Sequence, residues 1–401
     1  MVYFLFIVKS ALKDLFKNKV RTFLTSLGIL IGVASVVLLI ALGLGLKEYI
    51  RTQFYNLGTN LVYVMRGKIF TQGGGFTGTA IGNVKFDEKD YLRLKKITTT
   101  EVVVPIFLKT ATVQGDGKSE SGNFYATTPE IFFTRNLEID QGNLFTKANV
   151  DKKSKVVVLG PKIAEKLFSQ KERALNRTVR IESQAYKVVG VLKLKGGGGF
   201  GTPDFDSFIY APYKSAHVFN PDKIFTSFIL KAKDEISIPT LKREAKEVML
   251  RRYNADDISI ADQAEFINTI TSIFTALNSV LIGIGAVSLM VGGIGIMNIM
   301  YVSVTERIKE IGIRRALGAT KKDILFQFLA ESVFLSLIGG FVGLGLAFGV
   351  TLLIQRFFPA RIDGTSMVIA VSVSSFIGIF FGVFPARKAA NLSPMDAIRY
   401  E

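Results

Sequence analysis

Residues 23–46 read FLTSLGILIGVASVVLLIALGLGL, an uncharged run that lies between Arg21 and Lys47. About 20 apolar residues are enough to cross the hydrocarbon core of a bilayer as an α-helix. Each Leu, Ile, Val or Phe favours insertion by roughly 0.3 to 0.6 kcal/mol, so the whole run strongly favours the membrane. The apolar core of a signal peptide is shorter, about 7 to 15 residues. The run therefore predicts an uncleaved first transmembrane helix over residues 22–46.

Three further spans are expected. The uncharged stretch between Glu265 and Glu306 is about twice as long as a bilayer requires. In its first half, apolar side chains follow helical spacing among Asn, Thr and Ser, which predicts an amphipathic stalk outside the membrane: Phe266, Ile270, Ile273, Phe274, Leu277 and Leu281. Stalk and second span together cover residues 266–305, the third span residues 324–355 and the fourth residues 364–386.

Glycines are frequent in the second span. Small residues let another helix approach closely, either within one subunit or across a dimer interface, and both readings stay open. The glycines concerned are Gly283, Gly285, Gly292, Gly293 and Gly295.

Basic residues set the orientation. Lys and Arg gather before the first span, in the connection 306–323 and after the fourth span, whereas the connection 356–363 holds only Arg356 and Arg361. Because cytoplasmic loops carry the excess of basic residues, both termini are expected in the cytoplasm. Residues 1–21 then form a cytoplasmic interfacial helix, residues 387–401 a cytoplasmic tail, and residues 47–265 lie outside.

Composition agrees with a membrane protein that also carries a soluble domain. Hydrophobic residues make up 49% and charged residues 21% of the chain, which also carries a formal net charge of +17. We attribute this charge to topology and to contact with anionic membrane lipid, not to nucleic acid. The chain has no cysteine, so disulfides and thiolate metal sites are excluded.

The outer segment predicts an α+β domain. Val, Ile and Phe content indicates strands at residues 61–65, 102–113, 155–160, 178–181, 186–194 and 226–232. Helical patterns cover residues 87–97, 161–168 and 239–253. The glycine-rich segments 73–75 and 196–199 lack the spacing of a phosphate-binding loop and are expected to be flexible loops.

Candidates for catalysis are few. His217 is the single histidine and is expected to be structural, because no nucleophile elbow accompanies it. Asp204 and Asp206 are expected in a turn or solvated loop. We expect no catalytic residue, metal site or cofactor in this chain.

The connection between the second and third spans, residues 305–332, reads TERIKEIGIRRALGATKKDILFQFLAES. Topology and lipid contact would explain its charges alone. They do not explain the apolar residues interleaved with those charges, Ile311, Ile313, Ala316 and Leu317, which are followed by Gly318, a residue typical of helix ends. A short helix with one basic and one apolar face predicts docking into a groove on a partner.

These residues resemble the MacB/FtsX-like permease family of ABC systems, whose connection reads approximately V-x-E-R-x-x-E-I-G-x-R-x-A-x-G-A. The segment PARKAANLSPMDAIRYE, residues 385–401, is similar to the family ending P-A-x-x-A-A-x-x-x-P-x-x-A-L-R-x-E, with Ile398 in place of Leu. The outer segments KVVVLGPKIAEKLF (155–168) and YKVVGVL (186–192) resemble the MacB periplasmic core.

The resemblance implies a coupling helix that seats on an ATPase. The implied ATPase-coupling residues are Glu306, Arg307, Glu310, Ile311, Gly312, Arg314, Arg315, Ala316, Leu317 and Gly318. It also implies a dimer with a second, identical or different permease subunit, and two ATPase subunits that bind ATP and Mg²⁺. MacB carries its ATPase fused ahead of the first span; here that span begins near residue 22 and no phosphate-loop motif is found, so we expect a separate ABC ATPase subunit.

The fold class expected is an α-helical membrane protein, with four transmembrane helices and a large α+β extracytoplasmic domain between the first and second. Its location is the bacterial cytoplasmic membrane. We predict a permease that couples ATP hydrolysis to movement of the outer domains, for export or extraction of an amphiphilic peptide, antibiotic or lipoprotein, with room for a membrane-fusion adaptor outside. The alternative is a transmembrane regulator of an envelope enzyme such as a cell-wall hydrolase. A secondary carrier is disfavoured, because no charged residue sits at mid-depth in the spans.

Overall fold

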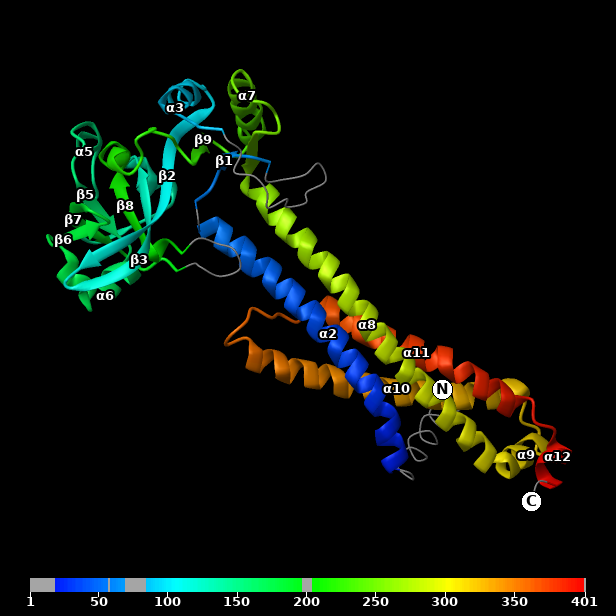
Figure 1. Ribbon diagram of the computed structural model, residues 1–401. Helices are drawn as coiled ribbons and strands as arrows, with labels where there is room; N and C mark the ends of the chain where they lie inside the picture. Colours follow the sequence, from blue (N-terminus) through cyan, green and yellow to red (C-terminus); the bar gives the residue numbers. More distant parts are fainter. Residues whose placement is uncertain (1–18, 57, 69–83, 197–203, 400–401) are drawn as a thin grey trace. The chain divides into compact units, whose positions relative to one another are not determined.

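The structure is a computed structural model that describes residues 19–56, 58–68, 84–196 and 204–399 (Figure 1). The chain divides into two compact units, Met1–Tyr49 together with Phe274–Glu401, and Ile50–Ile273. Most of the predicted interfacial helix, residues 1–18, and the glycine segment 73–75 lie outside the described residues, as do residues 197–199 of the second glycine segment.

Four long apolar helices confirm the predicted fold class, each long and apolar enough to cross a membrane. They are α2 (Lys19–Asn56), α8 (Gln263–Glu306), α10 (Lys321–Ile354) and α11 (Gly364–Ala390). Helix α2 extends beyond the expected 22–46 at both ends. Helix α8 is continuous over 44 residues, so the predicted stalk and span form one helix.

Small residues permit close helix packing in the first unit. A Cβ atom added to Gly28 of α2 would lie 2.8 Å from the Cα of Gly292 in α8. Gly285 and Gly293 likewise meet Val36 and Phe381, whereas nothing lies within 4 Å of a Cβ at Gly283. Three of the five glycines singled out in the second span therefore contact helices or side chains of their own chain.

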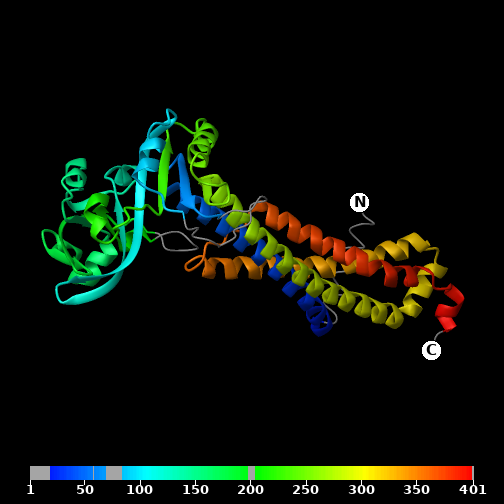
Figure 2. The same ribbon diagram turned by 45° about the horizontal axis from the view of Figure 1, so that its top comes forward.

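Helices α10 and α11 run side by side in both ribbon views (Figures 1 and 2). Buried serines lie between them, and the Ser332 hydroxyl donates to the backbone oxygen of Gly378 at 3.0 Å. This close approach is typical of membrane helices, in which association depends on packing and hydrogen bonds instead of a hydrophobic effect.

The second unit is built on a ten-stranded, mostly antiparallel sheet in the order β10-β1-β9-β2-β3-β8-β5-β7-β4, with β6 paired to β2 and β7. The strands are β1 (Leu61–Arg66), β2 (Thr100–Gly115), β3 (Lys118–Thr127), β4 (Ile139–Gly142), β5 (Val156–Leu159), β6 (Thr178–Ile181), β7 (Gln184–Leu192), β8 (Phe208–Pro212), β9 (Ser227–Ala232) and β10 (Ile258–Asp262). All six predicted strands are present; β3, β4, β8 and β10 were not predicted. Because β6 joins β2 to β7, the pairing closes a ring through β3, β8 and β5.

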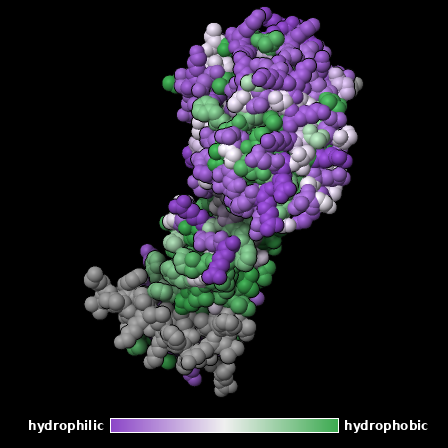
Figure 3. All heavy atoms as spheres, turned by 90° about the vertical axis from the view of Figure 1, so that its left-hand side faces the viewer, coloured by the Kyte–Doolittle hydropathy of each residue, from purple (hydrophilic) through white to green (hydrophobic). Residues whose placement is uncertain are grey.

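Short helices cover this sheet. They are α3 (Glu88–Leu94), α4 (Glu130–Thr134), α5 (Lys147–Asp151), α6 (Pro161–Phe168) and α7 (Ile238–Leu250), of which α3, α6 and α7 correspond to the predicted helices. Helix α6 starts with proline, which suits the first helical position, and buries Ile163, Leu167 and Phe168. The core needs no disulfide, since buried rings such as Phe124, Tyr186 and Tyr210 fill it. The surface of this unit that faces the viewer in Figure 3 is mostly hydrophilic.

Candidate functional site

A short helix follows α8 directly. Helix α9 (Ile308–Ala316) begins after Arg307 and ends before Gly318, whose φ of +101° is a left-handed conformation that glycine tolerates. The Thr320 side chain then caps α10 by accepting a hydrogen bond from the Asp323 backbone nitrogen. These signals bound a nine-residue helix inside the predicted connection 306–323.

Charged side chains fasten α9 to α10. Glu310 accepts hydrogen bonds from Arg307 Nε at 3.0 Å and from Arg314 Nη2 at 2.5 Å. Arg307 also reaches the buried carboxylate of Glu331 at 3.4 Å, and Arg314 donates to Gln327 Oε1 at 2.6 Å. Two residues of α10 thus hold α9 through separate arginines, so Arg307 and Arg314 have a structural task besides any role in topology.

Helix α9 also packs on the C-terminal helix α12 (Pro394–Arg399). A Cβ atom at Gly312 would lie 2.6 Å from the Cβ of Ala397, so glycine is needed for this approach. Ile311 is only 2% exposed. The predicted apolar docking face therefore needs a correction: Ile311 is buried in its own chain, in a cluster with Val304 of α8 and Phe328 of α10.

The remaining apolar residues of α9 are available to a partner. Leu317 is 83% exposed, and Ile313 and Ala316 are exposed beside it. Glu306 is exposed at the end of α8, and Arg315 is half-buried and donates to the Ala319 backbone oxygen. The structure thus separates the ten predicted coupling residues into an inner set that orients α9 and an outer set centred on Leu317. Sequence reasoning missed Gln327 and Ala397, which act on α9 from distant segments.

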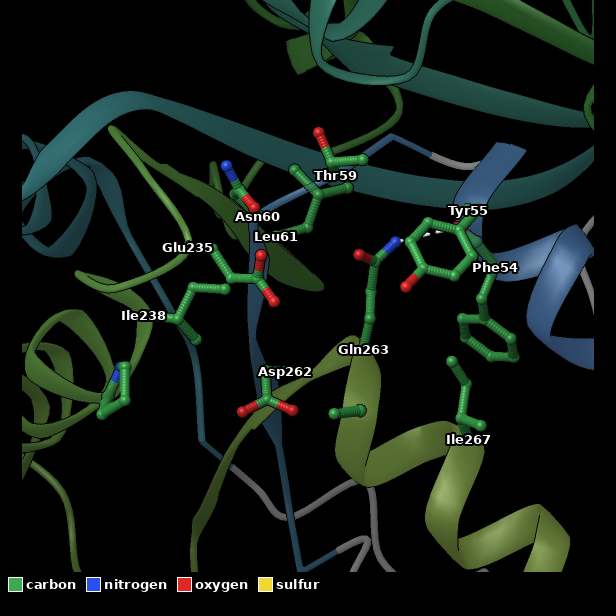
Figure 4. A pocket seen from close by; sticks show the side chains of 12 residues that line it. Phe54, Tyr55, Thr59, Asn60, Leu61, Glu235, Ile238, Asp262, Gln263 and Ile267 are labelled. Carbon is green, nitrogen blue, oxygen red and sulfur yellow. Dashed lines mark hydrogen bonds between the residues drawn. The ribbon is translucent and has the colours of Figure 1, made fainter.

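The second unit, Ile50–Ile273, which we call the outer unit, contains a pocket of about 340 Å³ (Figure 4). Its walls come from the last turn of α2, the start of β1, the segment leading into α7 and the first turns of α8: Phe54, Tyr55, Thr59, Asn60, Leu61, Glu235, Ile238, Pro239, Asp262, Gln263, Ala264 and Ile267. Phe54 stacks on Phe266, which also contacts Tyr63 edge-on. The pocket is thus backed by a packed aromatic group.

Hydrogen bonds fix two polar residues of this pocket. Gln263 Nε2 donates to the backbone oxygens of Phe54 and Gly58, at 2.9 and 2.6 Å. Asp262 caps α8 by accepting from the Glu265 backbone nitrogen, and it pairs with Lys242 at 2.9 Å. No local sequence pattern indicated this site, because its residues come from three separate segments.

The other candidates have structural roles. Asp206 lies in the short 3-10 turn Phe205–Ser207, in line with the first of the two expected settings, a turn or a solvated loop. It is 1% exposed and accepts from the backbone nitrogens of Lys195 and Gly196, so it is buried and not solvated. Asp204 pairs with Lys162 at 3.1 Å. His217 lies half-buried against the ring of Tyr213, and burial lowers its pKa. Within the described residues no group of three or more His, Cys, Asp or Glu side chains could hold a metal ion.

Two family descriptions match this chain. Residues 22–248 match the MacB-like periplasmic core domain, and residues 282–394 match the FtsX-like permease C-terminal region. The first match contains the first long helix and most of the outer unit. The second contains the end of α8, all of α9, and α10 and α11.

Curated relatives are similar along nearly the whole chain. The macrolide export ATP-binding/permease protein MacB of Neisseria gonorrhoeae is 34% identical over 386 residues, which are 95% of this chain and 58% of the relative. The protein of the same name from Bdellovibrio bacteriovorus is 34% identical over 96% of this chain and 60% of its own length. This chain therefore spans about three fifths of the relatives it matches.

One solved structure with a similar chain is the periplasmic region of MacB from Actinobacillus actinomycetemcomitans. It is 21% identical, covers 55% of this chain and 97% of its own, and has a TM-score of 0.46.

Proposed function

Because this chain belongs to the family that joins a MacB-like periplasmic core domain to an FtsX-like permease region, we propose that it couples ATP hydrolysis to movement of its outer domain. The family makes it a MacB-like ABC transporter permease and a multi-pass membrane protein. Under the proposal, an ABC ATPase subunit binds ATP and Mg²⁺ on the cytoplasmic side and α9 seats on it. The permease works as a dimer in the bacterial cytoplasmic membrane with both termini in the cytoplasm.

The observation that carries the proposal is the construction of α9. Glu310 joins Arg307 and Arg314, and these arginines reach Glu331 and Gln327 on α10, so a push on α9 is transferred to a long helix. Leu317 meanwhile is exposed together with Ile313 and Ala316, and this small apolar patch is the surface that we propose contacts the ATPase.

Helix length supports the mechanical part. With 44 residues at about 1.5 Å each, α8 is about 66 Å long, whereas the hydrocarbon core is about 30 Å thick. A continuous helix of that length can transmit tilt beyond the membrane. We propose that the cargo is an amphiphile, such as a peptide, antibiotic or lipoprotein, which is moved on the outer side; the relatives named for macrolide export support an antibiotic within this class.

A test replaces Leu317 and Ile313 by Asp, singly and together, in the permease reconstituted with its ABC ATPase in lipid nanodiscs. Losing two apolar contacts should weaken ATPase association and permease-stimulated ATP hydrolysis by about tenfold or more. Val218→Asp is the matched control, because Val218 is an exposed apolar residue of the outer unit. Unchanged association and hydrolysis in the double variant would contradict the proposal.

A second measurement separates transport from regulation of an envelope enzyme. Transport predicts that an amphiphilic cargo stimulates ATP hydrolysis by the reconstituted complex. Regulation predicts no such stimulation and instead an extracytoplasmic enzyme that binds the outer unit.

A further inference from the structure

No residue of α9 lines the pocket of the outer unit, so the proposed coupling of α9 to an ATPase does not account for this pocket. Its volume of about 340 Å³ is within the range of roughly 300 to 1,000 Å³ that is usual for small-ligand sites. Its residues come from three stretches of the chain, within residues 54–61, 235–239 and 262–267, so a ligand here would touch three separate segments of one unit.

Part of the pocket lining is apolar. Phe54, Leu61, Ile238 and Ile267 contribute aliphatic or aromatic surface. Tyr55 is 54% exposed and its ring faces the guanidinium of Arg51 at 5.6 Å. Ile236, next to the lining residue Glu235, is 91% exposed, so apolar surface continues beyond the pocket. An apolar body could be buried here with a gain that scales with the area removed from water.

Hydrogen-bond acceptors lie among these apolar residues, with Glu235 beside Ile238 and Gln263 beside Phe54 (Figure 4). Gln263 Nε2 donates hydrogen bonds to the backbone oxygens of Phe54 and Gly58. Its side-chain oxygen can therefore accept a hydrogen bond from a ligand in the pocket. Figure 4 shows this oxygen and the Glu235 carboxylate facing the same space, with Asp262 beside them. Thr59 and Asn60 add groups that can both donate and accept.

The charge of the pocket differs from that of the chain as a whole. No Lys, Arg or His is among the described residues that line the pocket. Asp262 is balanced by Lys242, but the carboxylate of Glu235 has no hydrogen bond or ion pair within the described part of the chain. In a chain of net charge +17, the pocket is therefore a local anionic site with an apolar floor.

We propose that this pocket binds a cationic amphiphile, whose protonated amine contacts Glu235 and the Gln263 oxygen while its apolar body lies against Phe54, Leu61 and Ile267. Glu235 is exposed, so a protonated amine would gain an ion pair there, a neutral amphiphile would gain none, and an anionic one would bring like charges together. Calling this ligand a cargo rests on the proposed function; the binding itself does not.

The test uses the full chain in nanodiscs of neutral phosphatidylcholine, without ATPase. The chain has no tryptophan, so Tyr55→Trp provides a single fluorescent reporter at the pocket. Octylammonium, octanol and octanoate share one alkyl chain and differ in charge. We expect saturable binding of octylammonium, at least about fivefold tighter than octanoate, and weakened about three- to tenfold by Glu235→Gln.

Two further variants make the result specific. Glu235→Lys should reverse the preference toward octanoate, whereas Glu247→Gln, which removes an exposed charge on α7 outside the pocket, should change nothing. For any one compound, partition into lipid is the same for all variants, so it cancels when that compound is compared between variants. Equal binding of the three compounds, or binding unaffected by Glu235→Gln, would overturn the proposal. That failure is distinguishable from failure of the coupling proposal, which is measured with ATPase and the Leu317 variant.

Discussion

The side-chain nitrogen of Gln263 lies 2.9 Å from the backbone oxygen of Phe54 and donates a hydrogen bond to it. Phe54 belongs to the last turn of α2, where the final backbone oxygens have no partner within the helix. Gln263 is the first residue of α8 and also donates to Gly58 at 2.6 Å. One side chain thus closes the end of one long helix and ties it to the beginning of the other.

Removal of this tie should loosen the end of α2. Gln263→Ala leaves two backbone oxygens without a protein donor, which costs about 1 to 3 kcal/mol. We expect backbone amides near residues 50–56 to exchange with solvent about tenfold faster or more, as measured by hydrogen–deuterium exchange. Gln114→Ala on the exposed side of β2 is the control. An unchanged exchange rate in Gln263→Ala would show that the hydrogen bonds of Gln263 do not stabilise the end of α2.

The close approach of Gly28 to Gly292 predicts strong sensitivity to side-chain size. Gly28→Val would force α2 away from α8, because a Cβ at residue 28 already lies 2.8 Å from the Gly292 Cα. The chain lacks cysteine, so a Val36→Cys, Gly285→Cys pair reports this contact cleanly by disulfide cross-linking. We expect at least a several-fold lower yield in Gly28→Val. Gly345→Val, where nothing lies within 4 Å of a Cβ, should leave the yield unchanged.

A buried carboxylate in α3 has Arg252 as its nearest cation. Asp90 is 1% exposed and accepts from Arg252 Nη1 at 3.0 Å and from the Tyr253 hydroxyl at 2.6 Å. Arg252 also pairs with Asp87, whose pKa it lowers. Arg252→Met would leave Asp90 with only the more distant Arg93, at 4.0 Å, and should lower the free energy of unfolding by about 2 kcal/mol.

The neighbouring arginine offers a matched control for this prediction. Arg251→Met changes an exposed residue and should shift the thermal unfolding midpoint little. Circular dichroism of the two variants at neutral pH compares them directly. Equal midpoints would mean that the pairing of Asp90 with Arg252 contributes nothing measurable.

The long helices and the apolar strands could be predicted because their signals are local. Charge-free runs give the helices, and Val-rich runs give strands such as β5. Strand β3 was missed because KSESGNFYAT is largely polar, although the turn before it carried a signal. Asp116 and Gly117 have positive φ values of 51° and 77°, which suits the Asp-Gly pair of a tight hairpin turn between β2 and β3.

The candidate sites could be predicted only in part, because amphipathic spacing identifies a face but not what covers it. Ile311 and Leu317 both fitted an apolar face of α9, yet only Leu317 is exposed. Ile311 is buried in a cluster that includes Phe328 and Ala389, residues that lie far from it in the chain. The pocket likewise combines Phe54, Glu235 and Gln263, and no local pattern can bring such residues together.

Lys195 should make the free energy of unfolding of the outer unit rise with pH in the alkaline range. Burial and the nearby Arg135 guanidinium lower the pKa of Lys195 from its ordinary 10.5 to about 8, although its amine donates to the backbone oxygens of Arg135 and Asn136. Between these two pKa values the unfolded chain holds a proton that the folded chain has released. The free energy of unfolding therefore rises with pH across this window.

The test compares Lys195→Met with the unaltered chain, by the thermal unfolding midpoint from pH 7.5 to 9.5. The midpoint of the unaltered chain should rise relative to that of Lys195→Met, because only the former gains from releasing this proton. The window ends at pH 9.5 because of the buried tyrosines: burial raises the pKa of Tyr91, for example, from its ordinary 10.0 to about 12. Above pH 10.0 the unfolded chain would release tyrosine protons that the folded chain keeps, and the free energy of unfolding would fall with pH. Lys246→Met, at an exposed position of α7, should follow the unaltered chain. A constant or falling difference between the unaltered chain and Lys195→Met would show that Lys195 keeps its proton in the fold, which would mean that the carboxylate of Asp206 outweighs burial.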